Sequence, residues 1–149
     1  MRAINHALTG ALLGLTIGEP AIAAPAALVS HYVLDAIPHH GSANKGWIRT
    51  KIFRDWLYID AVLCAALVIV LAIRRPVHWL LAAVCAFLAA SPDLLAINRY
   101  LHAIKHKPWK AGWYSRFAHK IQWFERPIGA VVEVVWLAAA LGLLLQFLH

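Results

Sequence analysis

The chain has 149 residues, enough for one domain, and 62% of them are hydrophobic, with a mean hydropathy of +0.65. Only 14% are charged, about half the usual share, which excludes an ordinary soluble domain. We therefore expect a single all-α domain over residues 1–149, built as a polytopic membrane helical bundle.

Long apolar runs predict about five membrane helices. The N-terminal part holds two shorter runs, 3–18 and 21–37, which Glu19 and Pro20 separate. A helix over the first run is only about 22–24 Å long, so these two form either full spans or a short re-entrant hairpin. Three further runs are long enough to cross a bilayer, namely 56–73, 77–97 and 128–148.

The basic residues predict the orientation of the bundle. With five helices, the N-terminus and the loops 38–55 and 98–127 share one face, and the opposite face keeps only Arg74 and Arg75. Because lysine and arginine remain on the cytoplasmic side, we expect a cytoplasmic N-terminus in the inner membrane. The shared face holds twelve basic residues: Arg2, Lys45, Arg49, Lys51, Arg54, Arg99, Lys105, Lys107, Lys110, Arg116, Lys120 and Arg126.

The 98–127 loop is both basic and aromatic, as its sequence NRYLHAIKHKPWKAGWYSRFAHKIQWFERP shows. Nucleic-acid binding produces a similar composition. In a chain with membrane helices, a segment that lies on anionic lipid is the favoured interpretation. We therefore expect a lipid partner and no nucleic acid.

Ionisable side chains inside the apolar runs point to function. A carboxylate at bilayer depth is costly unless it is paired, protonated or metal-bound, and such residues usually face the bundle interior. At 1.5 Å per residue, all candidates lie within roughly 10 Å of the cytoplasmic interface. They are His6, His31, Asp35, Asp60, Asp93 and Glu133. Asp60 has a second interpretation, a pair with a loop arginine such as Arg54.

The stretch SHYVLDAIPHHG carries the strongest pair. His31 and Asp35 are four residues apart, so a helix projects both from one side, where they can hold a divalent cation or orient each other. Pro38 ends that helix, which leaves His39 and His40 on the loop just above. We include His39 among the candidate ligands.

The candidates nearer the C-terminus depend on local helix geometry. Asp93 follows Ser91 and Pro92, so a kink at the proline is expected to turn it inward. His119 and Gln122 are three residues apart and share a face if their segment is helical. Outside the site, Gly10, Gly14 and Gly18 form a small-residue stripe for close helix packing. We expect both cysteines, Cys64 and Cys85, to be small buried apolar side chains.

Four stretches together resemble a known family: NHALTGALLG, SHYVLDAIPHH, SPDLLAI and HKIQWFERPIGAVVE. They are similar to the YdjM-like group of small bacterial membrane proteins, described as metal-dependent hydrolases. The spacing of His31, Asp35 and His39 also resembles the helix motif of zinc-dependent phospholipase C. The resemblance implies ligand roles for His6, His31, Asp35, Asp93, His119 and Glu133. The soluble phospholipases have a second histidine–acid pair on a helix. His119 and Glu133 are too far apart in this sequence to form such a pair by local helix spacing.

The function that follows is a membrane-embedded hydrolase of an ester or phosphoester. We expect a divalent metal, zinc first and manganese or iron as alternatives, to activate water at the cytoplasmic mouth. Asp35, Asp93 and Glu133 are the candidate catalytic carboxylates, and an anionic lipid or lipid-linked phosphate is the expected substrate. Two other classes stay open: an ion- or proton-coupled transporter, and a structural protein whose polar cluster locks the helices together.

Overall fold

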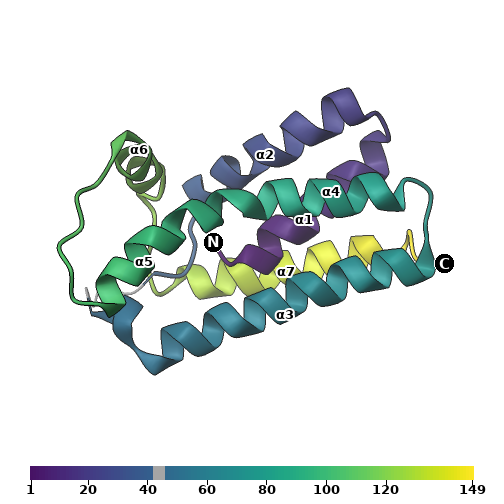
Figure 1. Cartoon of the computed structure of the whole chain (residues 1–149). Coiled ribbons are helices and arrows are strands. Elements are labelled where there is room, and N and C mark those ends of the chain that lie inside the picture. Colours follow the sequence, from purple (N-terminus) through teal and green to yellow (C-terminus); the bar gives the residue numbers. More distant parts are fainter. Residues whose placement is uncertain (42–45) are drawn as a thin grey trace.

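The computed structural model describes residues 1–41 and 46–149, and its regular structure is helical throughout (Figure 1). Within these ranges the one β-type contact is an isolated bridge between His39 and Glu125. The prediction of an all-α fold is therefore confirmed. The elements are α1 (Ala3–Ile17), α2 (Pro20–Ala36), η1 (Trp47–Arg49), α3 (Lys51–Arg74), α4 (Trp79–Ala90), η2 (Ser91–Ala96), α5 (Ile97–Ile104), α6 (Trp113–Ile121) and α7 (Gly129–Leu145).

Helix α1 is the centre of the bundle and packs against α2, α3, α4 and α7. Figure 1 shows the N-terminus, α5 and α6 gathered at one end, while the α1–α2 turn, the α3–α4 turn and the C-terminus lie at the other. We call the first end the polar end. The segments that carry most of the basic residues are at the polar end, as the predicted arrangement requires, and Lys45 lies outside the described residues.

Two helical segments are long and apolar enough to cross a membrane. They are α3, with 24 residues, and the continuous stretch Trp79–Ile104, with 26, in which α4 passes through η2 into α5. Helices α1 and α7 are apolar but shorter, with 15 and 17 residues, and α2 has 17. At 1.5 Å per residue, α1 and α2 extend about 22 and 25 Å, so the predicted N-terminal hairpin is short.

The outer faces of these helices are apolar. Only 17% of the most apolar window of α3, and 28% of the corresponding window in Trp79–Ile104, is buried. The exposed side chains include Val62, Ile69, Phe87, Val134 and Val135. A single apolar helix in a soluble core would be largely buried, whereas here the apolar surface faces outward.

Close approach of α1 to α4 depends on the predicted small-residue stripe. A Cβ atom on Gly10 would lie 2.2 Å from the carbonyl oxygen of Cys85, and one on Gly14 would lie 2.6 Å from Cα of Ala82. Gly18 has another role, because it ends α1 in the left-handed conformation, with φ of 68°. The cysteines are free thiols: Cys85 is buried and Cys64 is partly buried.

A methyl group at position 10 is expected to separate α1 from α4. Gly10→Ala should lower the free energy of unfolding by about 1–3 kcal/mol, because its contact is backbone that cannot rotate away. The matched control is Gly142→Ala in α7, where a Cβ atom meets nothing within 4 Å and helix propensity improves. Thermal unfolding in detergent micelles measures both, and equal effects of the two substitutions would contradict the packing account.

Candidate metal centre

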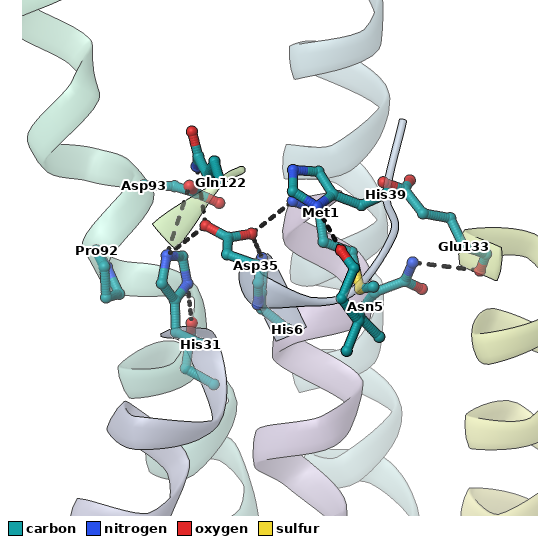
Figure 2. Close-up of polar contacts among 12 residues, drawn as sticks. Met1, Asn5, His6, His31, Asp35, His39, Pro92, Asp93, Gln122 and Glu133 are labelled. Atoms are coloured by element: carbon teal, nitrogen blue, oxygen red, sulfur yellow. Dashed lines mark hydrogen bonds and ion pairs between the residues drawn. The ribbon is translucent and has the colours of Figure 1, made fainter. Parts of the chain in front are cut away.

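A hydrogen bond to the backbone of Ala89 orients the His31 ring so that its second nitrogen can offer a lone pair to a cation. Its Nδ1 lies 2.9 Å from the carbonyl oxygen of Ala89, which only accepts hydrogen bonds, so the proton belongs on Nδ1. Nε2 then faces two carboxylates, 3.4 Å from Oδ2 of Asp35 and 3.9 Å from Oδ1 of Asp93 (Figure 2). A histidine fixed through one nitrogen by a carbonyl is the usual arrangement of a metal ligand.

His6 lies beside His31 with no access to solvent. Its Nε2 is 3.3 Å from Oδ1 of Asp35, and the two imidazole rings stack with centroids 4.1 Å apart. Neither ring nitrogen of His6 makes a hydrogen bond to any described residue. Nε2 has only the Asp35 contact and Nδ1 has no polar contact in the described chain, which is costly for a buried ring, so this side chain fits the role of a cation ligand.

Asp35 stands between the two histidines in the last turn of α2. The predicted contact with His31 is confirmed by the 3.4 Å separation. Asp35 also accepts a hydrogen bond from Nε2 of Gln122 at 2.9 Å and contacts the α-amino group of Met1 at 2.6 Å. These contacts fix both carboxylate oxygens, and so fix the direction in which Asp35 faces the rings.

Asp93 reaches the same centre from η2, the segment that follows α4. The helix changes to the 3-10 form at Ser91–Ala96, as expected for Ser91-Pro92, and Pro92 is buried. Donor atoms of His6, His31 and Asp93 all lie within 4.8 Å of one another. Ligands around a tetrahedral zinc ion are about 3.3 Å apart, so these atoms need only a small inward movement to share one ion.

The structure places His39 and Glu133 outside this group of three. His39 is buried, and its Nδ1 bonds locally to the carbonyl oxygen of Ile37 at 2.9 Å. Oε1 of Glu133 accepts from the backbone amide of His40 at 3.0 Å, and its carbonyl oxygen accepts from Nδ2 of Asn5 at 3.3 Å. The Glu133 side chain on α7 thus holds the segment that follows α2 against α7. A local sequence pattern does not reveal this long-range contact.

A cavity of about 70 Å³ adjoins the metal centre, between α2, η2 and α6. His31, Asp35 and Asp93 line one side, and His119 lines it from α6, so this candidate faces the cavity while remaining outside the group of three. Other polar side chains also line the cavity, namely Tyr32, Arg99, Tyr114, Ser115 and Gln122.

Sequence reasoning did not single out the cavity residues Arg99, Tyr114 and Ser115. Burial raises the pKa of Tyr114 above its ordinary range, so its phenol stays protonated and donates to the carbonyl oxygen of Pro92 at 3.4 Å. This bond joins α6 to η2 across the cavity. The sequence feature that could have pointed to these residues is the amphipathic segment WYSRFAHKIQ. This segment indicates a helix but not the element against which that helix packs.

Asp60 is paired with Arg2, which corrects the suggested partner Arg54. Nε and Nη2 of Arg2 lie 3.0 and 2.9 Å from Oδ1 of Asp60, and the guanidinium lies over the ring of Trp56 at 3.9 Å. The pair joins the start of α1 to α3 at the polar end. Asp60 therefore has a structural partner and does not need a metal.

No family model, curated protein or solved structure matches this chain.

The Arg2–Asp60 pair should contribute measurably to stability because Asp60 is nearly buried. Asp60→Asn is expected to lower the free energy of unfolding by about 1–3 kcal/mol, since it leaves the guanidinium without its charged partner. The control Asp55→Asn removes the exposed pair with Lys51, whose N–O distance is 3.9 Å, and should cost less than about 0.5 kcal/mol. Denaturant unfolding compares them, and a larger loss for Asp55→Asn would contradict this assignment.

Proposed function

We propose that the protein is a membrane-embedded, metal-dependent hydrolase of an ester or phosphoester at the cytoplasmic face. The observation that carries this proposal is the group of the buried His6 and His31 with the partly exposed Asp93, with Asp35 in contact with Nε2 of both rings and a cavity beside them. The motif resemblance to the YdjM-like group of membrane hydrolases points to the same chemistry.

The donor atoms suit a divalent cation. His6 has two buried ring nitrogens without hydrogen-bond partners in the described chain, and His31 turns an unprotonated nitrogen toward two carboxylates. Two imidazoles with carboxylates favour zinc first, and manganese or iron as alternatives. Bound there, the ion supplies a water molecule of lowered pKa and a positive charge beside the cavity.

The carboxylates and Gln122 of the centre have two roles: some accept protons, and others hold neighbouring side chains in place. Asp35 and Asp93 both line the cavity, so either carboxylate can accept a proton from a water molecule that attacks a bound substrate. Gln122 holds Asp35 in place through its 2.9 Å hydrogen bond. Glu133 acts as a positioning residue, because its carboxylate is occupied by the His40 amide.

The membrane placement rests on the outward apolar surface. Two helical segments have the length and composition of membrane spans, and their outer faces are exposed hydrocarbon. The basic residues gather at the polar end, which the positive-inside rule assigns to the cytoplasm. On this basis we place the protein in the inner membrane as a multi-pass bundle that includes the shorter α1, α2 and α7.

The distribution of buried residues favours a hydrolase over a carrier. A transporter needs polar groups along a path through the bundle. The buried polar side chains of the described residues are Asn5, His6, His31, Asp35, His39, Asp60 and Glu133. The contacts of these residues join them to the N-terminal residues and to the segment after α2, at the polar end. The rest of the α1 core is apolar, with Leu8, Ala11, Leu15, Leu71 and Leu144.

Metal analysis tests the proposed ligands. Protein purified in detergent without chelators should contain about one zinc, manganese or iron ion per chain by mass spectrometry. His6→Ala and His31→Ala each remove a donor and should reduce the metal content by at least tenfold. The control His102→Ala, on α5 outside the group, should keep the wild-type content.

Circular dichroism of the same samples separates loss of metal from loss of fold. A metal-free wild-type protein whose two variants fold equally well would overturn the proposal and support a structural protein with a polar lock. Metal retained at wild-type content in both folded variants would overturn the assignment of the ligands.

The proposed orientation has its own test. In a background with Cys64 and Cys85 replaced by alanine, Val77→Cys in the α3–α4 turn should react with a membrane-impermeant maleimide in intact bacteria. Lys110→Cys, in the connection between α5 and α6, should react only after lysis. The reverse pattern would place the metal centre on the outer side of the membrane.

A further inference from the structure

The wall of the cavity opposite the metal centre carries positive charge without a counter-ion. Arg99 lines the cavity from α5, and His119 lines it from α6. The guanidinium of Arg99 is exposed and makes no ion pair or hydrogen bond with any described residue. A free guanidinium with an imidazole and the Ser115 hydroxyl beside it is the side-chain chemistry that binds a phosphoryl group.

The cavity is open to the surface on the side of Arg99 and His119, whose side chains are exposed. A substrate can therefore place its phosphoryl group in the cavity while the rest of the molecule extends outward. Leu95, Ala96 and Ile121 also line the cavity, and Leu95 is 61% exposed. The part of the substrate that stays outside the cavity therefore meets an apolar surface.

From this arrangement we infer that the substrate is a terminal phosphate monoester on a lipid alcohol, and that Arg99 and His119 receive its phosphoryl oxygens. The inference rests on the proposed hydrolase function and narrows its substrate class. A phosphate monoester near neutral pH is a dianion with three free oxygens, which matches Arg99, Ser115 and His119 better than the single charge and two free oxygens of a phosphodiester. A carboxylic ester would leave Arg99 without an anion to bind.

The reaction balances with water as the only co-substrate. The oxygen of a water molecule forms a new bond to phosphorus, and the bond between phosphorus and the ester oxygen breaks, with its electron pair remaining on that oxygen. One proton from the water passes through a cavity carboxylate, Asp35 or Asp93, to the leaving oxygen. The products are the lipid alcohol and inorganic phosphate.

The substrate class is tested with metal-loaded protein in detergent micelles. Phosphatidic acid supplies a lipid phosphate monoester and 4-nitrophenyl phosphate a soluble one, while phosphatidylglycerol supplies a diester and 4-nitrophenyl acetate a carboxylic ester. Hydrolysis is followed by inorganic phosphate for the two monoesters, by 4-nitrophenol for the acetate, and by thin-layer chromatography of the lipid product for phosphatidylglycerol. The rate should be greatest with phosphatidic acid. Preference for the soluble monoester would overturn the lipid part of the inference, and preference for either of the other two would overturn the phosphate-monoester class while leaving a hydrolase.

The variant Arg99→Gln tests the binding residue. It should raise KM for phosphatidic acid by roughly tenfold or more with metal content unchanged, because one charge-assisted contact to the phosphoryl group is lost. Arg99→Lys should recover part of that loss. The matched control Arg116→Gln, on α6 outside the cavity lining, should keep the wild-type KM.

Binding of inorganic phosphate, followed by phosphorus NMR on the metal-loaded protein, separates the inference from the proposed function. Weaker phosphate binding in Arg99→Gln than in Arg116→Gln supports the phosphoryl site even if turnover fails, in which case the hydrolase proposal alone is overturned. Equal phosphate binding and equal KM in both variants would overturn the role of Arg99.

Discussion

Contact of the buried Asp35 carboxylate with the Nε2 edges of two stacked imidazole rings is the interaction on which the polar end depends. The carboxylate contacts Nε2 of His6 at 3.3 Å and Nε2 of His31 at 3.4 Å inside an otherwise apolar bundle. Since His31 keeps its proton on Nδ1, its Nε2 lone pair faces carboxylate oxygens, and like partial charges repel at that distance. The α-amino group of Met1 supplies one positive charge, on Oδ1 of Asp35. A metal cation shared by His6, His31 and Asp93 would remove the remaining repulsion, which is why we regard the group as a metal centre.

The fold brings this centre together through the central position of α1. The small residues Gly10 and Gly14 let α1 approach α4 closely, and this approach sets His6 beside His31 and Asp93. Three different helical elements therefore supply the donors, so the centre exists only in the assembled bundle. The apolar outer faces place the same assembly in lipid, with the cavity opening at the polar end.

The sequence was sufficient for features that depend on local spacing. The i, i+4 rule predicted the His31–Asp35 contact, and Pro92 predicted the break in α4 that carries Asp93 inward. Features set by long-range packing were not predictable, because no local pattern states which surfaces meet. The cavity forms only because α6 packs against α2 and bonds to Pro92 of η2 through Tyr114, and Glu133 bonds to His40, 93 residues away in the chain.

X-ray absorption at the zinc edge of the zinc-loaded protein tests the central claim most directly. The account predicts a first shell at about 2.0–2.1 Å made of two imidazole nitrogens and carboxylate oxygens, with the imidazole scattering halved in His6→Ala. A shell made only of water and carboxylate oxygens, unchanged in His6→Ala, would show that the ion lies elsewhere, and the account would then be wrong.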